Sequence, residues 1–288
     1  MTDPVTDPHE YRKESRRRWG RSAAGWQARR EQLARAAMPV SMAMIDRIGP
    51  QPGHTVLELA AGIGDTGFLA AELVRPGGTL ICSDFVPEML SAAQARAEQL
   101  GLENVRFKQI DAESIDLDAG SLDGVLCRWG YMLMADPEAA LRETRRVLRP
   151  GGRLALAAWT GPDENRWSSL PNGELLARGL IERPAPDEPG QFAWADRDRI
   201  GAALEAAGFV EDVAIERVAF TQAFPHLEAW WATQRDLSPR VADAVDSLEP
   251  AARAELEAAV FEQAGAFATG RDGALEIPAA TWVASATA

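Results

Sequence analysis

The residues with the clearest chemical potential follow a short apolar run near residue 56. The segment 56–67 reads VLELAAGIGDTG, so an apolar stretch carries Glu58 near its end and leads into a turn with Gly62 and Gly64. Glycine lets the backbone approach a ligand closely because it has no Cβ atom. A carboxylate beside the turn repels a phosphate and attracts a cation. The segment therefore predicts a small-molecule site whose ligand carries positive charge.

The same glycines leave a second class of ligand open. Gly62, Gly64 and Gly67 fit the G-x-G-x-x-G pattern of dinucleotide-binding domains, so an NAD(P)-dependent reductase is an alternative. Two features argue against it. Glu58 would repel a pyrophosphate, and Tyr131 has no lysine four positions later, where many short-chain reductases carry one. The glycine pattern alone is weak evidence for either class.

Alternating elements surround this turn. From about residue 50 to 160, short apolar runs alternate with glycine-bearing turns and helical segments. This punctuation predicts parallel strands joined by helices in right-handed crossovers. Two acids, Asp84 and Asp111, stand at the ends of the second and third expected strands. The five expected strands are residues 55–59, 79–83, 105–110, 124–129 and 153–159.

The segment from Val56 to Trp159 resembles the core of the class I S-adenosylmethionine-dependent methyltransferases, especially the branch of ubiquinone/menaquinone biosynthesis. The glycine turn, the two strand-end acids and the Pro-Gly-Gly turn at residues 150–152 carry the resemblance. Each piece alone is modest, but their order and spacing together are specific. The family has glycine where this chain has Ala60, a small-for-small change that should still permit a tight turn.

The resemblance implies a cofactor, S-adenosyl-L-methionine, and a role for each matching residue. Gly62 and Gly64 would face its methionine and ribose portions, and Glu58 would lie near its polar end. Asp84 would accept hydrogen bonds from both ribose hydroxyls, since a carboxylate offers two acceptor oxygens. The other implied contacts are Ala60 in the turn, Phe85, Met89, Asp111 and the backbone N–H of Ala112 at the adenine, and Cys127 and Arg128 at the methionine moiety.

Structural roles compete with several of these assignments. Asp84 would also suit a helix N-cap, since Asp is common before helix starts. Asp111 would suit a solvated turn, and Arg128 would suit the surface. Phe85 and Met89 would suit an ordinary core. These alternatives stay open at the level of sequence.

Aromatic residues outside the expected strands indicate where an acceptor would bind. Trp19 and Trp26 near the N-terminus, with Trp129 and Tyr131 after the fourth strand, are expected to line a pocket for a small apolar or aromatic molecule. Tyr131 and His226 are the candidates for a base. An apolar lining role suits Tyr131 better, and a surface or capping role suits His226 better. Not every methyl acceptor needs a base, so no catalytic residue is named.

The expected fold is α/β, a doubly wound, seven-stranded, mostly parallel sheet of the Rossmann-like methyltransferase type. Residues 1–50 are expected to form an N-terminal helical lid and residues 51–160 the cofactor-binding core. Residues 161–288 would supply an insertion after strand five, substrate-cap segments and the final strands. Two late apolar runs, residues 210–220 and 275–284, are expected to pair and complete the sheet despite the helices between them.

Charge restricts the classes of partner. The formal net charge is −13, which would repel a phosphate backbone, so we expect no nucleic acid partner. One basic stretch is an exception, and it could be a solvated helix face or could meet an anionic ligand. It comprises Arg12, Lys13, Arg16, Arg17, Arg18 and Arg21.

Other features set further expectations. Cys82 and Cys127 lie in apolar runs and predict reduced thiols, and the three histidines lack metal-ligand spacing, so no metal site is expected. No apolar stretch approaches the length of a membrane span, and the N-terminus has no apolar leader core, so a cytoplasmic protein is expected. A third interpretation is a non-catalytic, methyltransferase-like partner protein. The sequence does not indicate the oligomeric state.

Overall fold

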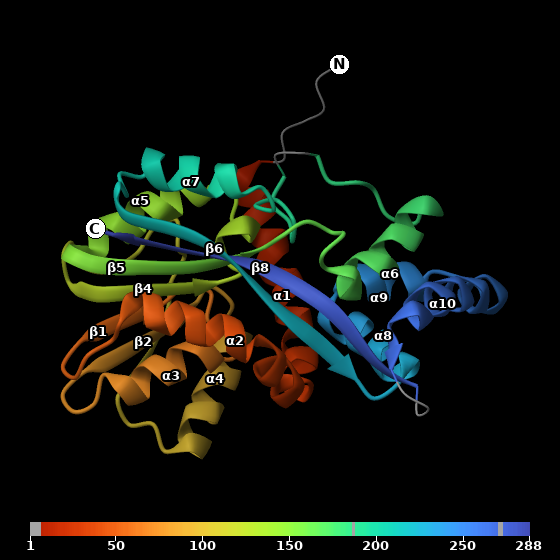
Figure 1. The fold of residues 1–288 in the computed structure, drawn as a ribbon, viewed down its shortest axis with the longest axis horizontal. Helices are drawn as coiled ribbons and strands as arrows, with labels where there is room; N and C mark the ends of the chain where they lie inside the picture. Colours follow the sequence, from red (N-terminus) through yellow and green to blue (C-terminus); the bar gives the residue numbers. More distant parts are fainter. Residues whose placement is uncertain (1–6, 186–187, 270–272) are drawn as a thin grey trace.

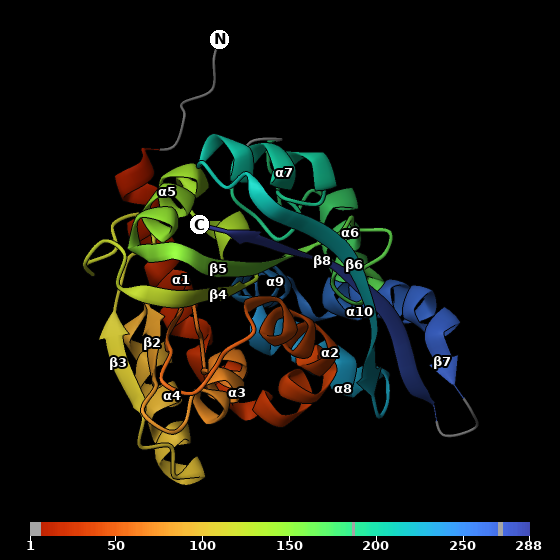
Figure 2. The same ribbon diagram turned by 60° about the vertical axis from the view of Figure 1, so that its left-hand side comes forward.

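The computed structural model describes residues 7–185, 188–269 and 273–288. Its centre is one sheet with strand order β3-β2-β1-β4-β5-β8-β6, shown in Figures 1 and 2. A short additional strand, β7, pairs with β8. The strands are β1 Thr55–Glu58, β2 Thr79–Asp84, β3 Val105–Gln109, β4 Leu122–Arg128, β5 Leu148–Trp159, β6 Glu211–Phe224, β7 Ala268–Thr269 and β8 Ala274–Thr287.

The sheet is parallel from β3 to β5, and its direction reverses at β8 and again at β6. Strand β8 is inserted between β5 and β6 and runs antiparallel to both. The expected pairing of the two late strands is confirmed, and it continues from Glu211 opposite Thr287 to Phe224 opposite Leu275. The carboxyl ends of β1, β2 and β4 therefore meet at one edge of the sheet, where parallel α/β sheets bind their ligands.

Helices cover both faces of the sheet, which confirms the doubly wound fold. Helices α2, α3 and α4 pack on one face, and α5 and α7 pack on the other (Figure 1). Local signals explain several helix ends: Asp136 caps α5 by accepting from the Ala139 N–H, and α4 ends at Gly101 in the left-handed conformation. The bounds are α2 Arg30–Ile48, α3 Asp65–Leu73, α4 Pro87–Leu100, α5 Pro137–Val147 and α7 Arg197–Ala206.

Four further helices form a cap at the end of the sheet where β6 and β8 extend beyond their neighbours (Figure 1). They are α6 Arg166–Ala177, α8 Leu227–Leu237, α9 Pro239–Asp246 and α10 Pro250–Ala264. The cap has its own buried cluster, in which Leu175, Trp230 and Val260 are fully buried. Helix α6 leaves no clear pattern in the sequence, because Pro171 interrupts its period and its stability comes from packing in this cluster.

The two N-terminal helices have different surroundings. Helix α2 is part of the main core, with Val40 and Met44 fully buried against the sheet. Helix α1, Pro8–Ala28, instead lies between the sheet edge and the cap, in contact with α4, α8 and α9. Of the described residues 7–50, those of α1 lie over the strand ends and those of α2 belong to the core, and the lid expected for residues 1–50 stays a prediction.

Three observations bear on membranes, metals and thiols. No helix in the described part of the chain is both long and apolar enough to cross a membrane. Among residues 7–185, 188–269 and 273–288, no group of three or more His, Cys, Asp or Glu side chains is arranged to hold a metal ion. Cys82 and Cys127 are free, buried thiols.

Candidate active site

The turn after β1 contains three residues in the left-handed conformation. Their φ angles are 48° at Ala60, 56° at Gly62 and 89° at Gly64. A Cβ atom on Gly62 would meet nothing within 4 Å, whereas one on Gly64 would lie 2.4 Å from the ring of Phe68. Gly62 therefore borders open space at the sheet edge, while Gly64 is needed for packing against α3.

Alanine occupies the first left-handed position at a small cost. A positive φ strains a residue with a Cβ atom by roughly 1 kcal/mol. The Ala60 methyl lies close to Gly130, because a Cβ atom on Gly130 would come within 2.8 Å of it. The turn thus forms with alanine in place of the family's glycine, and Gly130 provides the room for its side chain.

Glu58 is a buried acid with a free acceptor atom. Its side chain is 2% exposed, and its Oε2 atom has no hydrogen-bond partner. Burial raises the pKa of Glu58 to about 8, although Arg128 and the backbone N–H of Gly67 oppose the shift. A Cβ atom on Gly67 would lie 2.3 Å from Oε2, so this glycine makes room for the carboxylate. The third glycine of the pattern therefore has a different use from the helix-strand packing it serves in dinucleotide-binding domains.

Asp84 joins the end of β2 to the glycine turn. Its Oδ2 accepts from the Gly62 N–H at 2.8 Å, and its Oδ1 accepts from the Val86 N–H at 2.9 Å. Burial raises the pKa of Asp84 to about 6 despite these hydrogen bonds. Asp84 is not the N-cap of α4, which is Val86. Each carboxylate oxygen keeps a further lone pair for a ligand.

Helix α1 covers the loop after β2. Its residues Trp19, Ala23 and Trp26 pack in one cluster with Phe85 and Met89, and Ile63 and Val86 complete it. The two tryptophan rings are 6.0 Å apart, and the Trp26 Nε1 is buried without a hydrogen-bond partner. Two of the residues expected at the adenine, Phe85 and Met89, thus lie together with two of those expected at the acceptor.

Asp111 lies in the turn after β3, beside α1. Its side chain is 46% exposed, its Oδ1 accepts from the Glu113 N–H at 3.0 Å, and its Oδ2 is 3.8 Å from the Arg12 Nε. The following residue, Ala112, is buried. The geometry of a solvated turn is therefore present, and a ligand contact by Asp111 stays a prediction.

The last residue of β4, Arg128, places a cation close to the acids Glu58 and Asp65. The Arg128 guanidinium lies 4.7 Å from the centroid of the Trp129 ring. Burial lowers the pKa of Arg128, while Asp65 and Glu58 raise it. Burial also raises the pKa of the Cys127 thiol to about 12, so this cysteine is not a nucleophile near neutral pH.

Trp129 belongs to an aromatic group that the sequence did not reveal. Its ring stacks on Trp159 at 4.1 Å, and its Nε1 donates to the Thr281 Oγ1. Trp167 and Phe220 both contact Trp159, and the Trp167 Nε1 is buried without a partner. The members come from the turn after β4 and from β5, α6 and β6, so only the tertiary structure brings them together.

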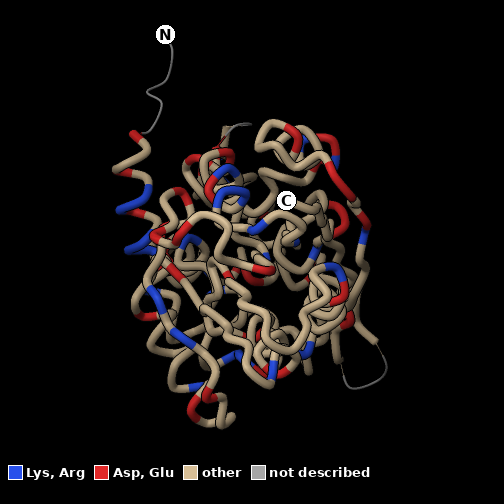
Figure 3. Tube along the Cα trace, turned by 90° about the vertical axis from the view of Figure 1, so that its left-hand side faces the viewer, with Lys and Arg blue, Asp and Glu red and all other residues tan. Residues whose placement is uncertain are grey.

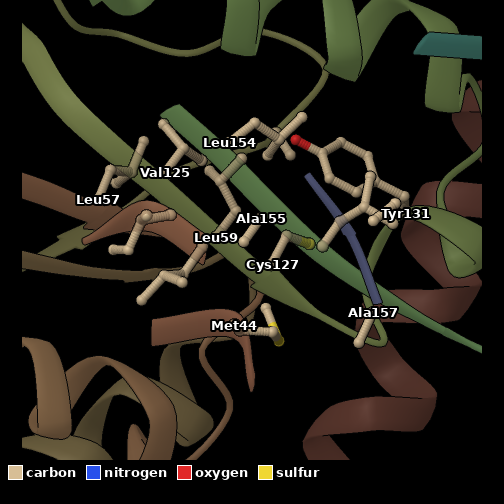
Figure 4. Close-up of a cluster of buried hydrophobic side chains, with 14 of the residues drawn as sticks. Met44, Leu57, Leu59, Val125, Cys127, Tyr131, Leu154, Ala155 and Ala157 are labelled. Atoms are coloured by element: carbon tan, nitrogen blue, oxygen red, sulfur yellow. The ribbon is translucent and has the colours of Figure 1, made fainter. Parts of the chain in front are cut away.

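Tyr131 lies in the core. It is 1% exposed, its ring stacks on Trp194, and its hydroxyl donates to the Thr144 Oγ1, which in turn donates to the Ala140 carbonyl. Figure 4 shows the ring among buried aliphatic side chains such as Leu154. Burial raises the pKa of Tyr131 well above its usual value, so it does not suit a base.

His226, the other candidate base, is an exposed N-cap of α8. Its Nδ1 accepts from the Ala229 N–H and lies 2.9 Å from Glu228. The capping interpretation of His226 therefore agrees with the structure.

Polar contacts hold α1 in place from both sides. Toward the sheet, the Tyr11 hydroxyl donates to the Leu133 carbonyl at 2.9 Å, and Arg12 pairs with Glu113. Toward the cap, Arg21 pairs with Asp243 and Arg29 with Asp236. Sequence reasoning missed Tyr11 and Arg12 as site-closing residues, because their partners are more than 100 positions away.

Comparisons with known proteins agree with this geometry. The model of the family described as "Methyltransferase domain" matches residues 50–171. Residues 50–171 are therefore similar to methyltransferase domains. Nocamycin O-methyltransferase of Saccharothrix syringae is 32% identical to the chain over 184 residues, covering 60% of this chain and 65% of that protein. Demethylmenaquinone methyltransferase of Thermus thermophilus is 41% identical over 131 residues, covering 46% and 56%.

A solved structure shares the fold of residues 50–171 and of their flanking elements. Phosphoethanolamine N-methyltransferase 2 of Haemonchus contortus, in complex with S-adenosyl-L-methionine, aligns with a TM-score of 0.51 at 17% identity. The alignment covers 86% of this chain and 52% of that one. The chain spans less than two thirds of the length of each curated relative named above. The residues that the family model matches include the glycine turn and the strand-end acids.

Proposed function

We propose that this chain transfers the methyl group of S-adenosyl-L-methionine to a small, apolar or aromatic acceptor. The observation that carries the proposal is the buried Glu58 carboxylate, which has an unpartnered oxygen, beside the open space at Gly62. S-adenosyl-L-methionine carries an ammonium group and a sulfonium but no phosphate. Such a ligand compensates a buried acid, whereas a dinucleotide would bring its pyrophosphate to the same turn.

The residues of the chain fit this cofactor. Asp84 is held by two backbone N–H groups and retains acceptor capacity for two hydroxyls. Phe85 and Met89 offer apolar surface beside it, under α1. The cofactor supplies an activated methyl on a good leaving group, so the protein has mainly to bind, orient and exclude water.

The acceptor is proposed to lie against the aromatic group after β4. Trp129 and Trp159 give it a stacked wall, and the Trp167 N–H provides a hydrogen-bond donor without a partner. Trp19 and Trp26 on α1 close the site from the other side. Aromatic walls favour an apolar or aromatic molecule. No side chain is assigned as base, since Tyr131 and His226 are both committed elsewhere.

The direct test is transfer of a labelled methyl group. The chain would be incubated with methyl-labelled S-adenosyl-L-methionine and a panel of phenols, quinols, amines and thiols. We expect label in one acceptor class, with a stoichiometric yield of S-adenosylhomocysteine, and no transfer by the Asp84→Ala variant. If the chain neither binds the cofactor nor transfers label to any acceptor, a non-catalytic partner protein becomes the better description.

A further inference from the structure

A second polar groove, of about 420 Å³, lies between α1 and α9. The groove is separate from the glycine turn, because one face of α1 lines the groove and another face packs toward the strand ends. Trp19 and Ala23 of α1 pack toward the strand ends, whereas Arg18 and Arg21 border the groove. The residues that line the groove are Glu14, Arg17, Arg18, Arg21, Leu180, Ile181, Pro239, Arg240, Asp243, Ala244 and Ser247.

The charge of this lining is opposite to that of the whole chain. Four arginines and two acids leave two uncompensated positive charges, in a protein whose net charge is −13. Arg17 pairs with Glu14, and Arg21 pairs with Asp243 at 2.6 Å. Figure 3 shows basic segments recurring along the helix below the N label. The basic stretch noted in the sequence is therefore only partly neutralised by folding.

Arg18 and Arg240 are the two arginines of the groove that form no ion pair with an acid among the described residues. Within the described residues, Arg18 has neither a hydrogen bond nor an ion pair, and Arg240 donates only to the carbonyl of Glu182. Burial lowers the pKa of Arg240, and the nearby charge of Arg18 lowers it further. Glu188 and Glu182 raise this pKa, but the net shift is downward. Two guanidinium groups that repel each other across a groove are a preformed site for an anion.

The rest of the lining indicates what the anion is attached to. Leu180 and Ile181 form an apolar part of the groove, together with Pro239 and Ala244. Helix α9 also begins at Pro239, so the positive end of its dipole lies at the groove. We propose that the groove binds the carboxylate or phosphate group of an amphipathic small molecule between Arg18 and Arg240, with its apolar part against Leu180 and Ile181.

Occupation of the groove would connect the cap to the cofactor-binding core. Arg18 is next to Trp19, which packs over the strand ends, and Arg240 belongs to the cap. An anion shared by the two arginines therefore replaces their repulsion by attraction and holds α1 against α9. The ligand is either an anionic end of the methyl acceptor or a separate molecule, and both share this chemistry.

Binding of simple probes tests the anion site without reference to methyl transfer. The full chain would be titrated calorimetrically with octyl phosphate, octanoate and inorganic phosphate, and with 1-octanol as the uncharged probe. We expect the two amphipathic anions to bind more tightly than 1-octanol, and the Arg18→Gln/Arg240→Gln double variant to weaken them at least 10-fold. Arg16→Gln, an exposed arginine of α1 outside the groove, should leave both affinities unchanged.

Two outcomes would overturn the proposal. One is an unchanged affinity in the double variant while its melting temperature stays near that of the parent chain. The other is equal weakening by Arg16→Gln, which would indicate a diffuse charge effect. A melting temperature measured for each variant separates loss of the site from loss of the fold.

Kinetic measurements distinguish an anionic methyl acceptor from a separate anionic ligand. These measurements rest on the proposed methyl transfer. If the acceptor carries the anionic group, octyl phosphate competes with it and the double variant raises KM with little change in kcat. If the ligand is a separate molecule, inhibition or activation is not competitive with the acceptor. Absence of any methyl transfer would count against the proposed function and leave the binding result standing.

Discussion

The strand-end site and the groove between α1 and α9 are both charged, but they are built differently. At the strand ends, Glu58 and Asp84 are buried acids, and backbone groups fix Asp84 in place. In the groove, Arg18 and Arg240 are partly exposed and come from helices more than 200 positions apart. A charge fixed by the local backbone is encoded in a short motif, whereas a charge gathered by packing is visible only in the fold.

The difference also predicts how each region responds to conditions. Buried carboxylates with raised pKa values make folding and ligand binding depend on pH. Partly exposed arginines act through a field that salt screens over about 10 Å. Changes at the strand ends should therefore have the larger effects.

The largest effect is expected from the titration of Glu58. Its pKa of about 8 exceeds the usual 4.5, so the folded state holds a proton that the unfolded state has lost in this window. The contribution of Glu58 to the free energy of unfolding is therefore greatest below about pH 4.5. As pH rises toward 8, the free energy of unfolding falls by roughly 2 to 4 kcal/mol. Glu58→Gln should remove the decline between pH 6 and 8.5, measured by urea unfolding.

The neighbouring acid provides the control for this measurement. Asp84 shifts in the same direction, but its pKa of about 6 confines its contribution to lower pH. A decline that persists above pH 6.5 in the Glu58→Gln variant would show that another group is responsible.

The next effect concerns ligand affinity at Asp84. Asp84→Ala removes the acceptor proposed for two ribose hydroxyls and also frees the Gly62 N–H. Hydrogen bonds to a charged acceptor contribute about 1.5 to 3 kcal/mol each, so the loss of two should weaken S-adenosyl-L-methionine binding at least about 100-fold in calorimetry. Asp84→Asn keeps one acceptor oxygen, so its affinity for the cofactor should lie between those of the parent chain and of Asp84→Ala. An affinity equal to that of the parent chain would remove Asp84 from the site.

A matched pair of glycine substitutions separates binding from folding. Gly62→Ala places a methyl group into open space where the cofactor is proposed to bind, so it should weaken cofactor binding about 10-fold. It should lower the free energy of unfolding only by the strain of a positive φ, roughly 1 kcal/mol. Gly64→Ala drives a methyl group into the ring of Phe68 and should cost about 1 to 3 kcal/mol in folding. Thermal unfolding and calorimetry measure the two quantities. The reverse pattern would mean that the space at Gly62 is not the ligand site.

The smallest effect is expected at the alanine that replaces the family's glycine. Ala60→Gly relieves the strain of φ 48° but adds backbone freedom to the unfolded chain, and these terms are of similar size. Stability should change by less than about 1 kcal/mol, and cofactor affinity by less than about threefold. A large loss in either would indicate that the Ala60 methyl contacts the ligand or that its packing near Gly130 matters.

Much of the fold was predictable because its signals are local. Three of the four connections between the five parallel strands contain a helix that begins at Pro or Asp, and the two late strands pair as expected. Helix α6 was missed since Pro171 hides its period, and the 2-residue strand β7 was too short to leave a pattern. The division of the N-terminal segment into a core helix and a covering helix depends on packing partners that the sequence does not name.

The candidate site was predictable to the same extent. Three site residues lie together because each stands at or just after the end of a strand that the sequence marks. They are Glu58, Gly62 and Asp84. The partners of Trp129 come from other elements, so its aromatic group was not predictable. Tyr131 looked similar to Trp129 in sequence, but its hydroxyl points to Thr144 in the core. The groove arginines were noted as a basic stretch, and only the fold reveals Arg240 opposite them.

The central claim is that Glu58 and the glycine turn hold the cationic amino-acid end of S-adenosyl-L-methionine, and one pair of titrations tests it most directly. At pH 8.5, the parent chain and the Glu58→Gln variant would be titrated calorimetrically with S-adenosyl-L-methionine and with methylthioadenosine, which has the same nucleoside but no ammonium group. The account predicts that the substitution weakens S-adenosyl-L-methionine at least 10-fold and changes methylthioadenosine little. Equal affinities in the two proteins, or tighter binding of NADH than of either nucleoside, would contradict it.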